Sequence, residues 1–93
     1  DIYQKDLESE FGITRSTASR VLRLMEQKGL VERQSVPHDA RLKKVMLTER
    51  SRRLVREMCQ TGTTLDARLL RGFSPDEVQT LYGFLDRMFQ NLE

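Results

Sequence analysis

The stretch Thr14–Lys28 reads TRSTASRVLRLMEQK, and its apolar residues follow the period of a helix with one buried face. At roughly 100° per residue, the apolar side chains fall in one narrow sector. These residues are Ala18, Val21, Leu22 and Met25. The pattern predicts a core-facing helix, and the rest of the chain is best understood around it.

The opposite sector of this helix is polar and cationic. It holds Ser16, Ser19, Arg20, Arg23 and Gln27, with Arg15 and Thr17 flanking it near the helix start. Arginine can pair bidentately with guanine O6 and N7, and short hydroxyls can reach base edges or phosphates. Such a face suits a helix lying in a DNA major groove. The alternative is the solvated face of an ordinary amphipathic helix.

Length and composition exclude several classes of protein. The 93 residues form one domain or a fragment of one, with a core that a partner chain would help to complete. One cysteine, Cys59, and one histidine, His38, exclude a disulfide framework and a structural zinc site. No segment approaches the roughly 20 apolar residues of a membrane span, and no signal peptide is visible. We therefore expect a cytoplasmic protein without a membrane partner or a cofactor.

The net charge of +2 conceals a segregation along the chain. Residues 1–11 carry −3, residues 12–56 carry +8 and residues 57–93 carry −3. A basic middle between acidic ends indicates a surface for a polyanion, and it coincides with the helix described above.

The residues before this helix predict a helix-turn-helix. Apolar residues recur at helical spacing from Ile2 to Phe11, and Gly12 then ends that helix. Ile13 follows as a buried plug, and Thr14 can cap the next helix. The order helix, tight turn, helix is that of a DNA-binding unit, although a plain helix hairpin shares this spacing.

The residues after Gly29 predict a β-hairpin. Leu30–Gln34 (LVERQ) and Lys44–Leu47 (KVML) are short apolar runs on either side of a polar, turn-rich tip, residues 35–43. A hairpin directly after a helix-turn-helix is a wing.

The predicted wing is cationic, with Arg41, Lys43 and Lys44. An arginine on a slim loop can enter the minor groove, whose negative potential favours guanidinium groups. The alternative is a solvated loop that keeps the hairpin soluble. Asp39 is better placed to orient the tip through local hydrogen bonds than to touch DNA.

A long helix is expected from the N-cap Thr48, with a bend at Gly62. Its apolar stripe is Leu54, Val55, Met58, Leu65 and Leu69. The arginines of its first turns can reach phosphates, but we favour a solvated face: Arg50, Arg52, Arg53 and Arg56. Cys59, beside the stripe, is expected to be a small buried hydrophobe rather than a redox switch.

The last helix begins with SPDE, in which Ser74 is the N-cap, Pro75 the first helical residue and Glu77 the end of a capping box. A wide apolar stripe follows in a heptad pattern: Val78, Leu81, Tyr82, Leu85, Met88, Phe89 and Leu92. We expect this stripe to form a dimer interface, with packing inside the chain as the alternative.

In this order and spacing, the chain resembles the MarR family of bacterial transcriptional regulators over nearly its whole length. Three pieces carry the resemblance: LESEFGITRSTASRVLRLMEQKGLVER (Leu7–Arg33), the wing DARLK (Asp39–Lys43) and VMLTE (Val45–Glu49). The family places a recognition helix, a D-x-R wing and a leucine-threonine-glutamate helix start at similar distances.

The resemblance implies a mainly α fold with a small β-hairpin wing. Residues 1–48 would form the winged helix-turn-helix DNA-binding lobe, and residues 49–93 a helical dimerisation region. The protein would bind a pseudo-palindromic operator in double-stranded DNA as a homodimer. Many members respond to small aromatic ligands or oxidants at a site between the dimerisation helices and the DNA lobe.

Family contacts to DNA carry over onto matching positions of this chain. They are Arg15, Ser16, Thr17, Ser19 and Arg20 on the recognition helix and Arg41 on the wing, which Asp39 would brace. Arg23 replaces a frequent acidic residue and, with Lys43, is expected to add affinity for DNA. Glu8 replaces a usual alanine in the first helix, and Ser51 a common glycine.

The family's N-terminal helices have no counterpart in this sequence, so we expect the natural protein to extend further. The competing function is a winged-helix protein-interaction module, which would show apolar residues on the recognition face. Only Leu24 lies near that face. An enzyme is not expected, because no acid–base pair, activated nucleophile, metal cluster or phosphate loop is present.

Overall fold

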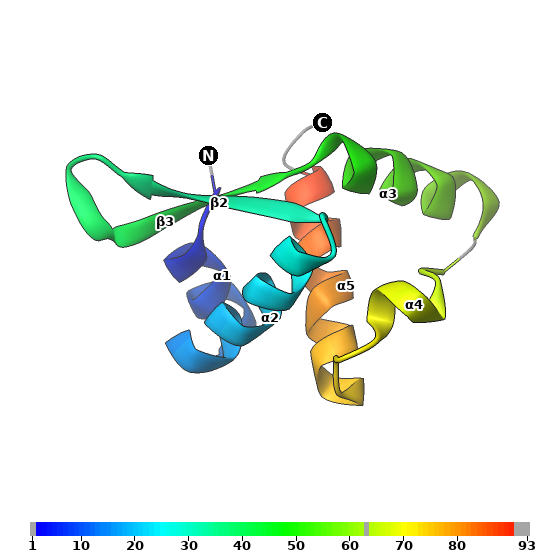
Figure 1. Ribbon diagram of the computed structural model, residues 1–93, viewed down its shortest axis with the longest axis horizontal. Helices are drawn as coiled ribbons and strands as arrows, with labels where there is room; N and C mark the ends of the chain where they lie inside the picture. Colours follow the sequence, from blue (N-terminus) through cyan, green and yellow to red (C-terminus); the bar gives the residue numbers. More distant parts are fainter. Residues whose placement is uncertain (1, 63, 91–93) are drawn as a thin grey trace.

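The elements form a mainly helical fold around a small antiparallel sheet (Figure 1). This computed structural model describes residues 2–62 and 64–90, with residues 40 and 41 described by their backbone alone. In chain order the elements are β1 (Ile2–Tyr3), α1 (Gln4–Phe11), α2 (Arg15–Gln27), β2 (Val31–Val36), β3 (Asp39–Leu47), α3 (Glu49–Thr61), α4 (Ala67–Leu70) and α5 (Pro75–Gln90).

The sheet has the strand order β1-β3-β2, so the first residues of the chain pair with the hairpin. Ile2 lies opposite Val45, and Tyr3 opposite Lys44. The prediction of a helix from Ile2 is therefore wrong by two residues, since α1 begins at Gln4. Strand pairing satisfies the backbone groups of Ile2 while its β-branched side chain enters the core.

The hairpin is longer than the sequence predicted. Its register runs from Val31 opposite Leu47 to Val36 opposite Asp39, with an irregularity at Ser35 and Val36. Only residues 37 and 38 remain as the turn, in place of the predicted tip 35–43. The apolar runs are shorter than the strands, because strands pair through backbone N–H and C=O groups, which polar residues also have. In Figure 1 the hairpin extends well beyond the helices to one side.

The turn between α1 and α2 has the predicted chemistry. Gly12 adopts φ +63°, a left-handed conformation that glycine accepts without steric cost. The Ile13 N–H donates to the Glu8 carbonyl at 3.1 Å, and the Thr14 hydroxyl accepts from the Thr17 N–H at 3.1 Å. Ile13 was expected to be buried, but it is only half-buried and packs against the core.

One hydrophobic core runs through the described residues from Ile2 to Met88, and α5 supplies much of it. Leu81, Phe84, Leu85 and Met88 are buried together with the apolar stripe of α2. Figure 1 shows α5 passing through the middle of the molecule, between α2 and α3. Phe84, which lies outside the predicted heptad stripe, is fully buried.

Helix α3 begins as predicted at Thr48, whose hydroxyl accepts from the Ser51 N–H at 3.1 Å. The prediction of one long helix to Leu69 is wrong, because α3 ends at Thr61 and Gly62 caps it at φ +72°. Leu65 nevertheless reaches the core, and its N–H donates to the Tyr82 hydroxyl at 3.0 Å.

Three side chains of α3 differ from the expectation. Cys59 is exposed rather than buried, so the expectation of a small buried hydrophobe is wrong. Arg50 is not merely solvated, since its guanidinium donates to the Lys28 carbonyl at 2.9 Å and so satisfies a carbonyl at the end of α2. Arg53 and Arg56 are exposed as expected, whereas Arg52 is only half-exposed and its Nε is buried.

Candidate nucleic-acid interface

The polar face of α2 stands on a fully buried apolar stripe. Ala18, Val21, Leu22 and Met25 have no exposed surface. Their burial fixes the rotation of the helix and turns the opposite side chains to the surface. Arg15, Ser16, Thr17, Arg20 and Arg23, all predicted to contact DNA, are exposed, and so is Gln27.

A network of polar side chains joins α2 to α1 and β2. Gln4, only 5% exposed, donates to the Ser19 hydroxyl at 2.8 Å. Arg33 donates to the Gln4 side-chain oxygen at 3.0 Å and forms an ion pair with Glu26 at 2.8 Å. The network satisfies buried polar groups and holds α2 in register with its neighbours. Gln4 also donates to Glu8 at 3.3 Å, so the carboxylate that replaces the usual alanine has a role in the same network.

No pattern in the sequence predicted this network. Gln4 and Arg33 belong to segments that meet only in the folded chain, and neither lies on the polar face of α2. Their contribution is to position Ser19, which is half-buried rather than fully presented to the surface.

A polar hollow lies where α1, α2 and β3 meet. It has a volume of about 170 Å³ and is lined by Gln4, Lys5, Glu8, Arg15, Ser19 and Lys43. The cationic residues outnumber the single carboxylate, so the hollow favours an anionic group such as a phosphate. It brings together Arg15, Ser19 and Lys43, which the sequence predicted separately.

Of the three predicted wing residues, the structure describes the side chains of Lys43 and Asp39 but not that of Arg41. Lys43 donates across the hairpin to the Ser35 hydroxyl at 2.9 Å, which fixes its side chain close to β2. Asp39 begins β3 opposite Val36. The side chain of Arg41 lies outside the described part of the chain, and its predicted entry into the minor groove stays a prediction.

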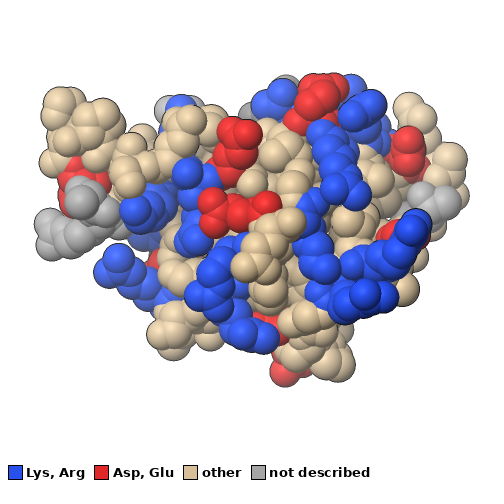
Figure 2. Space-filling view, in the orientation of Figure 1, with Lys and Arg blue, Asp and Glu red and all other residues tan. Residues whose placement is uncertain are grey.

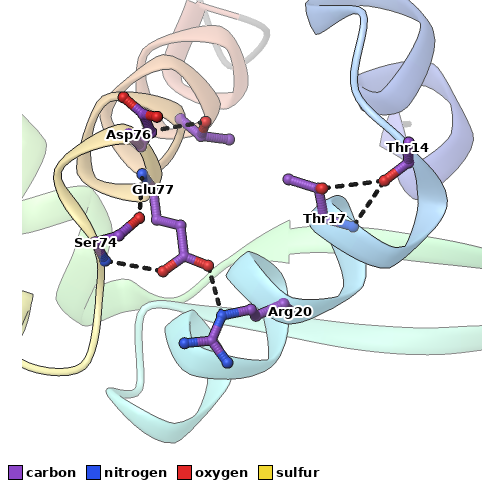
Figure 3. A network of polar contacts seen from close by, with 7 residues as sticks. Thr14, Thr17, Arg20, Ser74, Asp76 and Glu77 are labelled. Atoms are coloured by element: carbon purple, nitrogen blue, oxygen red, sulfur yellow. Dashed lines mark hydrogen bonds and ion pairs between the residues drawn. The ribbon is translucent and has the colours of Figure 1, made fainter.

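One predicted DNA contact is held by the last helix. The Arg20 Nε donates to Glu77 Oε2 at 2.6 Å, joining α2 to the first turn of α5 (Figure 3). Glu77 also closes the predicted capping box, because its Oε1 accepts from the Ser74 N–H at 2.8 Å and its own N–H donates to the Ser74 hydroxyl. The Ser74 N–H and the Arg20 guanidinium lower the pKa of the Glu77 carboxyl, which is therefore ionised at neutral pH.

Basic side chains are spread over one broad face of the molecule. Figure 2 shows Lys and Arg near the base of the hairpin, over the lower centre and on the side of α3 and α4, with a few acidic residues among them. Apart from α4, these elements belong to the basic middle segment of the sequence, and the basic side chains give the face a positive field.

An apolar hollow of about 310 Å³ lies on the other side of the core, between α3 and α5. Its lining residues are Val55, Met58, Cys59, Tyr82, Leu85 and Asp86. The described residues contain no cluster of His, Cys, Asp or Glu suited to a metal ion. No helix in the described ranges is long and apolar enough to cross a membrane.

The predicted dimerisation stripe divides into two groups. Leu81, Leu85 and Met88 fill the core of this chain. The half-buried members are Val78, Tyr82 and Phe89, and Leu92 lies outside the described residues. The role of the stripe in dimerisation stays a prediction, as does the division into lobes at residue 48.

The helix-turn-helix, the attached hairpin and the basic face of α2 define a winged-helix protein. The sequence model described as MarR family matches residues 1–42. The chain is 33% identical to the transcription regulator MarR from Oenococcus oeni PSU-1, covering 97% of this chain and 67% of that one, with a TM-score of 0.52. The chain therefore belongs to the MarR family of transcription regulators, as the sequence predicted.

Other solved structures share the fold. An S. aureus MepR–DNA complex is 26% identical, with 99% of this chain and 67% of that chain covered and a TM-score of 0.60. A crystal structure of MarR is 24% identical, with 98% of this chain covered and a TM-score of 0.61, and this chain spans 62% of its length.

Proposed function

We propose that this chain is a sequence-specific regulator of transcription that binds double-stranded DNA through α2 and the β2–β3 wing. The observation that carries the proposal is the exposed face of α2, where guanidinium and hydroxyl groups stand over a fully buried stripe. This face fits the major groove, and the hairpin lies beside it at the position of a wing. Its polar character disfavours a surface for apolar protein partners.

Salt-dependent DNA binding tests the proposal. Arg15→Ala/Arg23→Ala should lower the slope of log K against log salt by about 1 to 2 units, because each neutralised phosphate contributes about 0.9. The matched control is Arg53→Ala/Arg56→Ala, which removes the same charge from exposed arginines of α3. Fluorescence anisotropy with a labelled duplex at several salt concentrations gives the slopes.

Two results would contradict the proposal. One is a wild-type chain that fails to bind duplex DNA even at low salt. The other is an equal change of slope in both double variants, which would mean that only the overall charge matters and α2 has no particular role.

The working unit in this proposal is a homodimer bound to a pseudo-palindromic operator in the cytoplasm. Val78, Tyr82 and Phe89 on α5 support it, because these apolar residues are only half-buried and a second chain would cover them. Sedimentation velocity across a range of concentrations measures the dimer. Loss of the dimer in Phe89→Ala, with the monomer still folded, is the expected result.

A small aromatic effector would bind in the hollow between α3 and α5. The apolar lining and the volume of about 310 Å³ suit a ligand of that class. Its position beside α5, which contacts α2 through Glu77, allows binding there to affect the DNA-facing helix.

A further inference from the structure

The ion pair between Arg20 and Glu77 joins a DNA-facing side chain to a helix with no DNA-facing role. Arg20 has 52% of its side chain exposed, whereas Glu77 has 13%. The pair therefore lies at the edge of the surface, with its carboxylate inward and its guanidinium outward. Figure 3 shows the terminal amino groups of Arg20 pointing away from Glu77.

Glu77 is itself rigidly held. One carboxylate oxygen accepts from the Ser74 backbone N–H at 2.8 Å, and the other accepts from Arg20 Nε at 2.6 Å. The capping box fixes the first turn of α5, so the oxygen that meets Arg20 has a defined position. An arginine side chain otherwise has several rotatable bonds to order when it binds.

The geometry of the contact leaves Arg20 able to read a base. A guanidinium can bind in bidentate fashion through the edge that includes Nε or through the edge formed by the two terminal amino groups. Glu77 engages Nε and so leaves the terminal edge available. That edge matches the O6 and N7 acceptors of guanine in the major groove.

We infer that Glu77 is a positioning residue for sequence readout: it holds Arg20 so that its terminal amino groups bind a guanine of the DNA site. The inference rests on the proposed function. It adds that the base recognised by Arg20 is a guanine and that Glu77 of α5 fixes the orientation of Arg20. Without the carboxylate, Arg20 still carries its charge and attracts phosphates, but it loses the fixed orientation that selects one base.

Glu77→Gln is the appropriate variant, because glutamine also closes a capping box and keeps α5 intact. The matched control is Asp76→Asn, which removes one negative charge from the same turn of α5. Any general gain in electrostatic affinity is shared by both variants and cancels in the comparison. Arg20→Ala and Arg20→Ala/Glu77→Gln complete a double-mutant cycle.

The readout is enrichment of bound sequences from a random duplex pool, followed by affinities for the selected site and for single-base changes of its guanines. A bidentate arginine is worth roughly 5- to 150-fold in discrimination. Glu77→Gln should lose roughly three- to tenfold of the preference at one guanine, with little change in affinity for unrelated DNA. Asp76→Asn should keep the preference, and Glu77→Gln should have no further effect in the Arg20→Ala background. Thermal melts check that all variants fold.

Three results would overturn the inference. A Glu77→Gln variant with the wild-type guanine preference would show that Arg20 needs no positioning. Uniformly tighter binding with unchanged preference, not shared by Asp76→Asn, would show that Glu77 only competes with DNA for Arg20. A wild-type chain that enriches no sequence would contradict the proposed function itself and the inference with it.

Discussion

The burial of Phe84 provides a quantitative test of how α5 packs. Its side chain has no exposed surface, and its ring meets that of Phe11 edge-to-face, with 5.3 Å between centroids and 65° between planes. Phe84→Ala should lower the free energy of unfolding by about 3–5 kcal/mol, of which the ring pair accounts for about 0.5–1.5 kcal/mol. Since domains have a total stability of about 5–15 kcal/mol, this is a large part of the whole.

Urea denaturation followed by circular dichroism measures the loss at a protein concentration at which sedimentation velocity finds the wild type and the variants monomeric, so that loss of a dimer adds nothing to the cost of Phe89→Ala. Phe89→Ala is the matched control, because it removes the same side chain from a half-buried position on the same helix. Because Phe89 is only partly buried, we expect Phe89→Ala to lower the free energy of unfolding by about 1–2 kcal/mol. If Phe84→Ala does not fold, Phe84→Leu should still do so, with a melting temperature lowered by roughly 4–16 °C for a loss of about 1–2 kcal/mol.

The relative costs of Phe84→Ala and Phe89→Ala show whether α5 packs mainly inside this chain. If α5 packed mainly on a partner chain through its heptad stripe, Phe89 would be the more deeply buried ring and Phe84 the more exposed. A cost for Phe89→Ala equal to or greater than that for Phe84→Ala would therefore refute the packing described above.

Two further predictions concern the same helix. A Cβ at position 83 would lie 2.8 Å from Phe11 Cε1, so Gly83→Ala should cost about 1–3 kcal/mol despite its better helix propensity; an unchanged or raised melting temperature contradicts this. The Glu77 pKa lies below its usual 4.5, mainly through the Ser74 N–H and also through Arg20. The ionised Glu77 carboxylate therefore contributes its full stabilisation of the fold above the usual pKa of 4.5, and this contribution is lost as the pH falls through the lowered pKa. Denaturation of wild type and Glu77→Gln should differ at pH 7 and converge between about pH 5 and pH 2, and a difference that widens in acid refutes the assignment.

Features set by nearby residues could be predicted from the sequence. The buried stripe of α2, the turn at Gly12 and the caps at Thr14 and Thr48 are all confirmed. The stripe depends on the period of a helix, the turn on a glycine with positive φ, and each cap on a hydroxyl that accepts a hydrogen bond from the N–H three residues later. A short stretch of sequence therefore contains each whole interaction.

Features that join distant segments could not be predicted in this way. Strand β1 forms only because β3 offers a free edge to Ile2 and Tyr3. The burial of Phe84 depends on Phe11 lying opposite it, and Gln4 of α1 meets Arg33 of β2 although the whole of α2 separates them in the chain. Periodicity identifies a face of a helix, but it does not identify what packs against that face.

Glu77 shows how both kinds of information meet in one side chain. Its capping box with Ser74 is local and was predicted, and Arg20 was predicted independently as a DNA contact. Their pairing depends on how α5 packs against α2, which the heptad stripe alone did not reveal. Because one oxygen of Glu77 is fixed by α5 and the other binds Arg20, the position of α5 determines where that guanidinium lies. The helix expected to form a dimer interface is thus also part of the structure that positions the surface proposed to face DNA.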